Sequence, residues 1–294
     1  MEKNQGNPPE PHVGRRCQGE TDDFKMMTDY HVHIGQWNDV YFKAEDIFYA
    51  LKKNGIGECW FSSTTSCLYS KTIVAGKSDA ESLSHEELYL KIREEVKSAL
   101  EYAQAIDFKA HALYWVVPDI VKSGIGIERA MTECPYDGFK LHPRAQEWKL
   151  DDPVTVNFTE ELFSYAEKQN LRILIHTGAS GVDSPKRFEH FIKAHPNCLV
   201  QLAHLKDLDA QEYMLKNYPN VVVDSSFAGE NEIGALVDDG IEPKRILWGT
   251  DMPVTYWWYN VLGKEKIPSI GKEVLTEFYK RNHYSNESVG ASYV

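Results

Sequence analysis

The chain has 294 residues, of which 42% are hydrophobic and 26% are charged, and its 32 basic and 44 acidic side chains give a formal net charge of −12. This acidic balance argues against a general nucleic-acid-binding protein, which normally presents a basic surface, so we expect no nucleic-acid partner. No stretch is apolar and long enough to span a bilayer and the N-terminus lacks a signal-peptide core, so we expect no membrane partner either.

Residues 1–24 contain much Gly, Pro, Asn, Glu and Asp and almost no large apolar side chain. A segment of this composition cannot bury enough apolar surface to fold, which predicts a flexible N-terminal tail. We expect the remainder, residues 25–294, to form one domain, because a barrel of alternating strands and helices typically takes about 250 residues.

After the tail, short apolar runs alternate with segments of helical periodicity. The runs predict eight strands, at residues 30–34, 56–61, 108–117, 136–142, 171–176, 199–204, 221–225 and 245–251. Gly35 is expected to end the first strand. Helices are predicted at residues 43–54, 85–104, 120–132, 160–169, 186–194, 209–217, 230–238 and 274–279. The polar segment 71–84 is the longest insertion between strands and is interpreted either as a lid or as a solvated loop.

The nearly continuous apolar strands indicate parallel strands that are buried on both faces. An α/β fold of this kind, a (β/α)8 TIM barrel with parallel strands, is the expected architecture. The alternative is a doubly wound open sheet, which usually carries a glycine-rich turn after its first strand. No such turn follows the first strand here.

Five cysteines, Cys17, Cys59, Cys67, Cys134 and Cys198, are scattered along the chain without Cys-x-x-Cys spacing. An odd, dispersed set favours reduced thiols over a disulfide framework or a zinc ribbon. We therefore expect a cytoplasmic protein.

His31 and His33 lie two residues apart on the first predicted strand. Side chains alternate between the two faces of a strand, so both imidazoles point to the same side. Histidine is a common ligand of zinc-like ions, and the pair can form half of a metal site. Alone, a His-x-His pair is weak support for a metal site.

Polar residues also stand at the C-terminal ends of later strands, where a barrel of this type carries its catalytic groups. They are Lys140 and His142 on the fourth strand, His176 on the fifth, His204 on the sixth, Ser225 with Asp224 one step before it on the seventh, and Asp251 on the eighth. Their recurrence at one end of the barrel predicts a metal site.

The order His-x-His, Lys-Leu-His-Pro, Ile-His-Thr-Gly, Ala-His-Leu and Leu-Trp-Gly-Thr-Asp-Met-Pro resembles the metal-dependent amidohydrolase superfamily. The most similar branch is the amidohydrolase-related group that also contains aminocarboxymuconate-semialdehyde decarboxylase. The resemblance covers about residues 26–280, and its most specific part is the segment 245–253. It implies a TIM barrel and a divalent metal, which we expect to be Zn²⁺.

By this resemblance, His31, His33, His176 and Asp251 are the implied ligands of one metal ion. Three imidazoles and one carboxylate can hold a divalent ion that still has room for water. Asp251 is also expected to be catalytic, because it can accept a proton from the water and deliver it to the leaving group. His204 is implied to contact the water or the substrate, or to bind a second ion if two metals are present.

Lys140 allows two interpretations. Its motif resembles the strand-four motif of dihydroorotase-like members, in which the lysine is carboxylated and bridges two metals. Alternatively, Lys140 stays charged, one metal is bound, and the ammonium group binds an anionic part of the substrate; we favour this second interpretation. Further candidate substrate contacts are His142, Arg144 as a partner for a carboxylate, and Trp257, which lies in an aromatic run after Asp251. For Arg144 the alternative, a surface arginine without a role in the site, is favoured.

Two reactions follow from the resemblance. The first is hydrolysis of an amide, ester or lactone of a small, carboxylated substrate by metal-activated water. The alternative is non-oxidative decarboxylation of an unsaturated or aromatic acid. A barrel with only a structural metal site is less consistent with the sequence, since structural zinc sites are usually closed by cysteines. The expected partner is a small-molecule substrate, and the sequence leaves a homo-oligomer open.

Overall fold

The structure is a computed structural model that describes residues 27–37, 40–69, 83–179 and 181–256. The predicted tail at 1–24, nearly all of the segment 71–84, the candidate contact Trp257 and the helix predicted at 274–279 lie outside the described residues. The division into a tail and one domain therefore stays a prediction.

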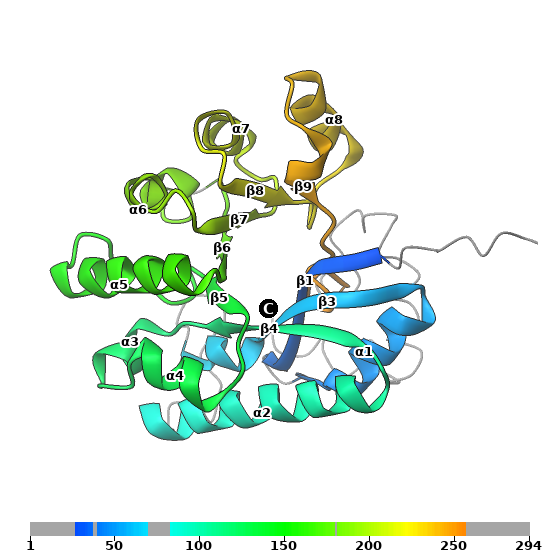
Figure 1. The fold of residues 1–294 in the computed structure, drawn as a ribbon, viewed down its shortest axis with the longest axis vertical. Helices are drawn as coiled ribbons and strands as arrows, with labels where there is room; N and C mark the ends of the chain where they lie inside the picture. Colours follow the sequence, from blue (N-terminus) through cyan, green and yellow to red (C-terminus); the bar gives the residue numbers. More distant parts are fainter. Residues whose placement is uncertain (1–26, 38–39, 70–82, 180, 257–294) are drawn as a thin grey trace, which may run out of the picture.

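In the described part of the chain, nine strands form one sheet in the order β2-β1-β3-β4-β5-β6-β7-β8-β9 (Figure 1). Every neighbouring pair is parallel except β1 with β2. The strands are β1 (Met27–Trp37), β2 (Val40–Phe42), β3 (Ile56–Ser63), β4 (Lys109–Trp115), β5 (Gly138–Leu141), β6 (Arg172–His176), β7 (Leu199–Ala203), β8 (Val221–Asp224) and β9 (Ile246–Leu247).

The helices labelled in Figure 1 lie outside the curved sheet and connect its successive parallel strands. The α-helices are α1 (Ala44–Lys53), α2 (His85–Ala105), α3 (Pro118–Lys122), α4 (Ile127–Glu133), α5 (Pro153–Gln169), α6 (Glu189–Ala194), α7 (Leu208–Asn217), α8 (Glu230–Asp238) and α9 (Val254–Tyr256). Short 3-10 helices are η1 (Thr64–Tyr69), η3 (Pro185–Phe188) and η4 (Pro243–Arg245). Among these described helices, none has the length and apolarity needed to cross a membrane.

Backbone hydrogen bonds join β1 to the segment that follows β9 and so link the first and last parallel strands. The Asp251 N–H donates to the His31 carbonyl at 2.7 Å, and the His33 N–H donates to the Met252 carbonyl at 2.7 Å. With this closure, eight parallel strands surround a common axis, as a (β/α)8 barrel requires. The predicted α/β fold, a TIM barrel with parallel strands, is confirmed.

Gly35 does not end the first strand, so that prediction was wrong. β1 continues to Trp37 and pairs with β2 in an antiparallel hairpin. Gly35 has φ +90°, and a Cβ there would lie 2.6 Å from Ser63 Oγ and 2.7 Å from Thr65 Oγ1. The glycine is therefore required for a close approach between β1 and the end of β3, within a strand that goes on.

The helix predicted at 120–132 is also wrong, because it is two helices, α3 and α4. Gly124 separates them with φ +98°, a conformation that ends a helix and that glycine adopts without strain. The helix predicted at 160–169 begins earlier, at Pro153. Its start is fixed by Asp152, whose carboxylate accepts a hydrogen bond from the Val154 N–H at 3.2 Å.

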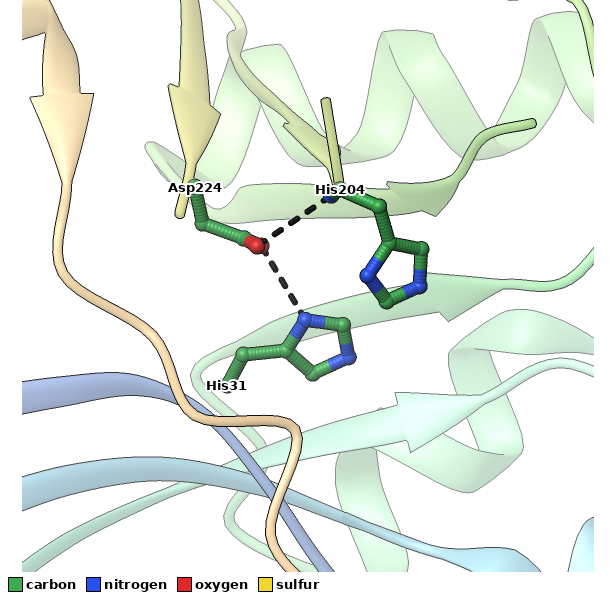
Figure 2. A group of neighbouring side chains, drawn as sticks. All are labelled: His31, His204 and Asp224. Atoms are coloured by element: carbon green, nitrogen blue, oxygen red, sulfur yellow. Dashed lines mark hydrogen bonds and ion pairs between the residues drawn. The ribbon is translucent and has the colours of Figure 1, made fainter. Parts of the chain in front are cut away.

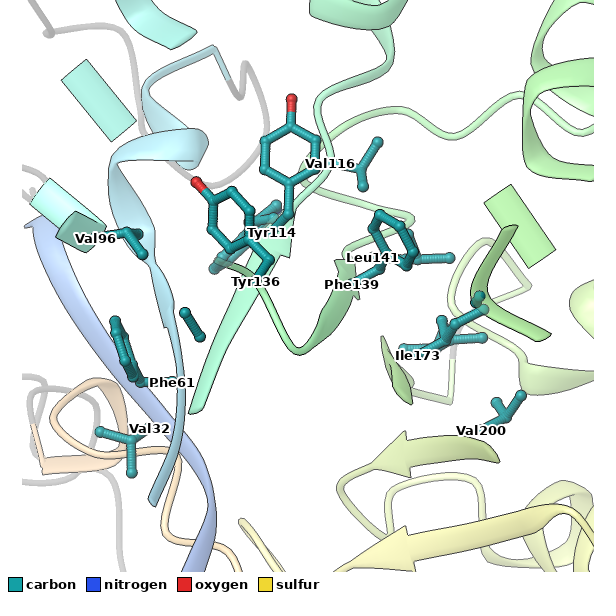
Figure 3. Close-up of a cluster of buried hydrophobic side chains, with 14 of the residues drawn as sticks. Val32, Phe61, Val96, Tyr114, Val116, Tyr136, Phe139, Leu141, Ile173 and Val200 are labelled. Carbon is teal, nitrogen blue, oxygen red and sulfur yellow. The ribbon is translucent and has the colours of Figure 1, made fainter. Parts of the chain in front are cut away.

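The main core lies between the sheet and the helices. Figure 3 shows part of it, including Val32, Phe61, Val96, Phe139 and Ile173, all of them 1% exposed or less. On β1 and β5, core residues of this kind alternate with polar residues that face the interior of the barrel. On β1, Val32 packs in the core and the flanking His31 and His33 face inward. On β5, Phe139 and Leu141 pack in the core and Lys140 faces inward. Polar side chains from different strands therefore face one central space.

Candidate metal centre

His31, His33 and Asp251 form a compact group inside the barrel. The two histidines flank the core residue Val32 on β1, and Asp251 follows β9. Asp251 Oδ1 lies 2.7 Å from His33 Nε2 and 3.3 Å from His31 Nε2. The three residues are at most 4% exposed, and one ligand atom from each lies within 4.8 Å of the others. Two imidazole nitrogens and a carboxylate oxygen are a donor set that divalent zinc-like ions accept, so the residues fit a metal.

Asp251 reaches this group through an unusual backbone conformation. Its φ is +52°, and its N–H is bonded to the His31 carbonyl. Burial alone raises the pKa of its carboxyl group, but His31 and His33 outweigh burial and hold that pKa well below its usual range. Asp251 is therefore a carboxylate, able to bind a cation or accept a proton.

Lys140 lies beside the same group. It stands on β5 between Phe139 and Leu141, which belong to the outer core, so its side chain points into the barrel. Its Nζ is 2.8 Å from His31 Nε2, and the residue is 1% exposed. Burial lowers the pKa of the ammonium group to about 8, although Asp251 opposes this effect. The structure thus places a buried cation next to a predicted ligand.

His176, the fourth predicted ligand, lies in a neighbouring group. Its Nδ1 is 3.0 Å from His204 Nε2, and its ring stacks on that of His142 at 3.7 Å. His204, with φ +63°, in turn stacks on His31 at 5.2 Å. Burial lowers the pKa of His204 to about 3 and those of His142 and His176 well below the usual value. These three imidazoles are therefore neutral at neutral pH.

Arg144 is paired with a carboxylate. Its Nε lies 2.7 Å and its Nη2 2.6 Å from Asp183 Oδ2, which comes from the connection between β6 and α6. Asp183 can also group with His142 and His176 around a cation. The predicted contact of Arg144 with a substrate therefore competes with an internal ion pair. The structure brings His31, His33 and Asp251 together, places Lys140, His142, His176 and His204 around them, and leaves Arg144 half exposed at 48%.

Asp224 is the residue whose role sequence reasoning missed. It ends β8, is 0% exposed, and its Oδ2 lies 3.0 Å from His31 Nδ1 (Figure 2). Its Oδ1 accepts from the His204 N–H at 3.3 Å and from the Ser226 hydroxyl. A histidine ligand commonly donates its second ring nitrogen to a carboxylate in this way. The available hint was a lone acidic residue at the end of the run Val221–Val223.

Two further contacts to the group were also missed. Ser62, on β3, has its Oγ 3.0 Å from His33 Nδ1. Trp115, at the end of β4, lies 5.4 Å from the His33 ring and 5.6 Å from the His142 ring, and Lys140 Nζ is 5.6 Å from its centroid. From the sequence alone, Trp115 cannot be distinguished from an ordinary core aromatic residue. Its position beside the site depends on the geometry of the barrel.

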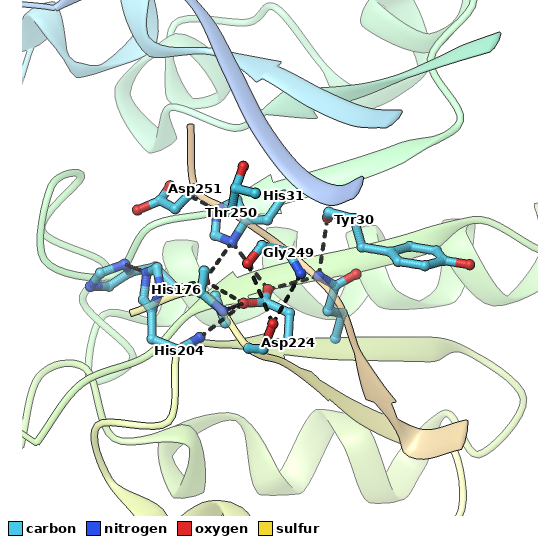
Figure 4. Close-up of polar contacts among 12 residues, drawn as sticks. Tyr30, His31, His176, His204, Asp224, Gly249, Thr250 and Asp251 are labelled. Carbon is cyan, nitrogen blue, oxygen red and sulfur yellow. Dashed lines mark hydrogen bonds and ion pairs between the residues drawn. The ribbon is translucent and has the colours of Figure 1, made fainter. Parts of the chain in front are cut away.

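The buried carboxyl group of Asp29 holds the Trp-Gly-Thr-Asp segment against β1. Figure 4 shows Thr250 and Asp251 of this segment beside His31. Asp29 accepts hydrogen bonds from Thr250 N at 3.0 Å, Thr250 Oγ1 at 2.6 Å and His31 N at 3.1 Å. A Cβ on Gly249 would come within 3.0 Å of the His31 Cβ. The glycine and threonine of this motif therefore position Asp251 against the strand that carries the two histidines.

Comparisons with known proteins agree with this architecture. The amidohydrolase family model matches residues 98–262, more than half of the chain. No curated protein matches the sequence.

Similar solved structures include a TatD-like protein from Archaeoglobus fulgidus, with 11% identity, a TM-score of 0.52, and coverage of 89% of this chain and 95% of that one. 4-Oxalomesaconate hydratase from Rhodopseudomonas palustris has 13% identity and a TM-score of 0.51, and the match covers 90% of this chain and 97% of that one. 2,6-Dihydroxybenzoate decarboxylase from Rhizobium has 12% identity and a TM-score of 0.49, and the match covers 90% of this chain and 95% of that one. At these identities the similarity concerns the fold.

The family match confirms the resemblance found in the sequence motifs. It spans β4 to β9 and therefore includes Lys140, His142, His176, His204 and Asp251. The assignment of individual roles to these residues stays a prediction. The chain belongs to the amidohydrolase family and is an enzyme of that superfamily.

Proposed function

We propose that this enzyme depends on a divalent metal, with zinc as the first candidate. His31, His33 and Asp251 hold the metal, and His176 is the fourth ligand. The observation that carries the proposal is the convergence of two imidazole nitrogens and one carboxylate oxygen inside a closed barrel. A divalent ion bound there supplies Lewis acidity to a substrate oxygen or to water. The substrate is a small molecule with a carboxylate group, because the buried Lys140 provides a cation at the same place.

The first candidate reaction is hydrolysis of an amide, ester or lactone. Its support is the ionised state of Asp251, whose carboxylate can accept the proton of an attacking water and return it to the leaving group. His204 is neutral and lies beside His31, where it can hydrogen-bond to the water or to the substrate carbonyl.

The second candidate reaction, non-oxidative decarboxylation, is supported at least as well by the surroundings of Lys140. The flat faces of Trp115 and His142 stack at 5.6 Å beside the ammonium group and suit an unsaturated or aromatic acid. In this reaction the bond from carbon to the carboxylate breaks, CO₂ leaves, and the electron pair stays on carbon. Lys140, with its pKa lowered to about 8, can then donate the proton that replaces CO₂.

One experiment tests the proposal and separates the two reactions. Metal-loaded protein is incubated with ¹³C-carboxyl-labelled aromatic and unsaturated acids, and separately with lactones, esters and amides in H₂¹⁸O. We expect turnover that disappears when a chelator removes the metal. Release of ¹³CO₂ identifies a decarboxylase, and ¹⁸O in a product acid identifies a hydrolase. Metal-independent turnover of either substrate set would contradict the proposal.

Replacement of Lys140 tests its role. We expect Lys140→Ala to keep one bound metal and to weaken the use of anionic substrates. Loss of a charge-assisted hydrogen bond costs about 1.5–3 kcal/mol, which corresponds to a fall of roughly ten- to a hundredfold in kcat/KM. Metal analysis and steady-state kinetics measure the two effects, and Lys149→Ala, an exposed lysine after the same strand, is the matched control.

The opposite result has a clear meaning. If Lys140 is carboxylated and bridges two ions, Lys140→Ala lowers the metal content from two to one or none. A small added carboxylate then partly restores activity by filling the vacated position. That pattern would exclude the role of Lys140 as a free ammonium group.

A further inference from the structure

We propose that Arg172 and Gln201 are positioning residues that, through Asp224, fix His31 in the tautomer whose Nε2 lone pair faces the metal centre. The proposal rests on the proposed metal centre and concerns the residues that support one of its ligands. A chain of hydrogen bonds, here called the relay, joins four residues on neighbouring strands: Arg172 on β6, Gln201 on β7, Asp224 on β8 and His31 on β1.

Gln201 is the unusual member of the relay. It lies in the middle of β7 between the core residues Val200 and Leu202, so it faces the barrel interior, and it is 0% exposed. A buried amide is costly unless its oxygen and both its hydrogens find partners. All three do. Gln201 Oε1 is 2.9 Å from Arg172 Nη1, and Nε2 is 2.8 Å from Asp224 Oδ2 and 3.2 Å from the Tyr30 carbonyl.

The partners determine which way this amide points. A guanidinium group has only donors, so the atom of Gln201 that faces Arg172 has to be the oxygen. The nitrogen then faces the Asp224 carboxylate and the Tyr30 carbonyl, which are both acceptors. The reverse orientation would set N–H against N–H on one side and oxygen against two oxygens on the other. The relay therefore has one direction, with Gln201 donating to Asp224.

The direction carries over to His31. Asp224 Oδ2 accepts from Gln201 and lies 3.0 Å from His31 Nδ1, and a carboxylate can only accept. An imidazole with a single ring hydrogen thus carries it on Nδ1, and Nε2 carries the lone pair. On the opposite side of the ring, Nε2 lies 2.8 Å from the donor-only ammonium group of Lys140 and 3.3 Å from Asp251 Oδ1, so its closest partner is a donor.

Arg172 is held rigidly enough to anchor the relay. Its guanidinium lies 4.2 Å from the Trp60 ring centroid and 4.8 Å from that of Tyr30. Stacking on two aromatic faces fixes the plane of the group and hence the direction of its N–H bonds. A histidine ligand binds a metal through an unprotonated ring nitrogen that points toward the ion. The relay fixes both the tautomer and the orientation of His31 in this way before the ion binds.

The test uses metal-free, full-length protein with ¹⁵N-labelled histidine. Nitrogen chemical shifts distinguish a protonated from an unprotonated ring nitrogen, and the His31 signals are identified by their absence in His31→Ala. We expect the wild type to show His31 protonated at Nδ1 and not at Nε2. Gln201→Glu keeps the acceptor for Arg172 but removes the donor to Asp224, and we expect it to lose this single-tautomer signature.

Zinc affinity is the second readout, measured by competition with a chromophoric chelator. We expect Gln201→Glu and the similarly sized Gln201→Met to bind zinc roughly 10- to 100-fold more weakly, as is usual when the partner of a metal-ligating histidine is lost. Gln146→Met is the matched control, since Gln146 is a buried glutamine bonded to the Ser66 carbonyl at 2.8 Å. Arg172→Lys keeps a donor-only cation, so we expect this variant to bind zinc more tightly than Arg172→Met does.

The outcomes separate the relay from the metal centre. If folded Gln201 variants keep the His31 tautomer and bind zinc within about threefold of wild type, the relay has no positioning role and the proposal is overturned. If zinc affinity is unchanged even when His31 and His33 are both replaced, the proposed metal centre fails. Thermal denaturation of each variant shows whether it is folded, and Gln201→Met replaces Gln201→Glu in both readouts if the latter does not fold.

Discussion

The double variant His31→Ala/His33→Ala is expected to contain no bound divalent metal and to remain a folded barrel. The two substitutions remove both imidazole nitrogens of the group. They leave Asp251 and the predicted ligand His176, which are too few ligands for tight binding. Both rings point into the barrel interior, whereas the core residues Val32 and Ile34 between and beside them are unchanged. Metal content is measured by elemental analysis of protein purified without chelator.

Folding of the double variant is checked by circular dichroism and thermal denaturation. Some loss of stability is expected, because Asp224 and Asp251 each lose a buried partner. His190→Ala, which removes an exposed histidine next to α6 residue Phe191, is the control and should leave the metal content at the wild-type level. A folded double variant that retains a full equivalent of metal would show that the ligand assignment is wrong.

Asp251→Asn is expected to bind metal and yet to lose most of the catalytic rate. Asparagine keeps an oxygen that can ligate an ion, but its amide cannot accept a proton. General acid–base catalysis typically contributes about 10²- to 10⁴-fold, so kcat should fall by a factor in that range. Metal analysis and steady-state kinetics on the same preparation separate the effect on binding from the effect on rate.

The control for this variant is Asp238→Asn, which changes an exposed carboxylate at the end of α8. Its rate and metal content should match those of the wild type. If Asp251→Asn retains full metal and a rate within a few-fold of wild type, Asp251 has no role in proton transfer. If it loses the metal, the rate is compared again after loading at high metal concentration.

Local sequence patterns predict most of the framework. The helices α1 and α2 begin and end within one or two residues of their predicted bounds, because apolar spacing and the caps at their ends are local features. The start of α2 has a capping box between Ser84 and Glu87, which the sequence displays directly. The prediction fails where contacts between distant residues determine the structure. At Gly35, for example, the missing Cβ makes room for the Ser63 and Thr65 hydroxyl groups.

The sequence by itself therefore determines the alternation of strands and helices, the common face of His31 and His33, and the polar residue types at the strand ends. These depend on the period of a strand and on local propensity. It does not determine which strand ends meet across the barrel. That depends on closure of the sheet and on the backbone after each strand, such as the positive φ of His204 and Asp251, which few non-glycine residues adopt. Only the tertiary structure could place Asp224 and Gln201 beneath His31 and pair Arg144 with Asp183, since each of these contacts joins residues from different strands or connections.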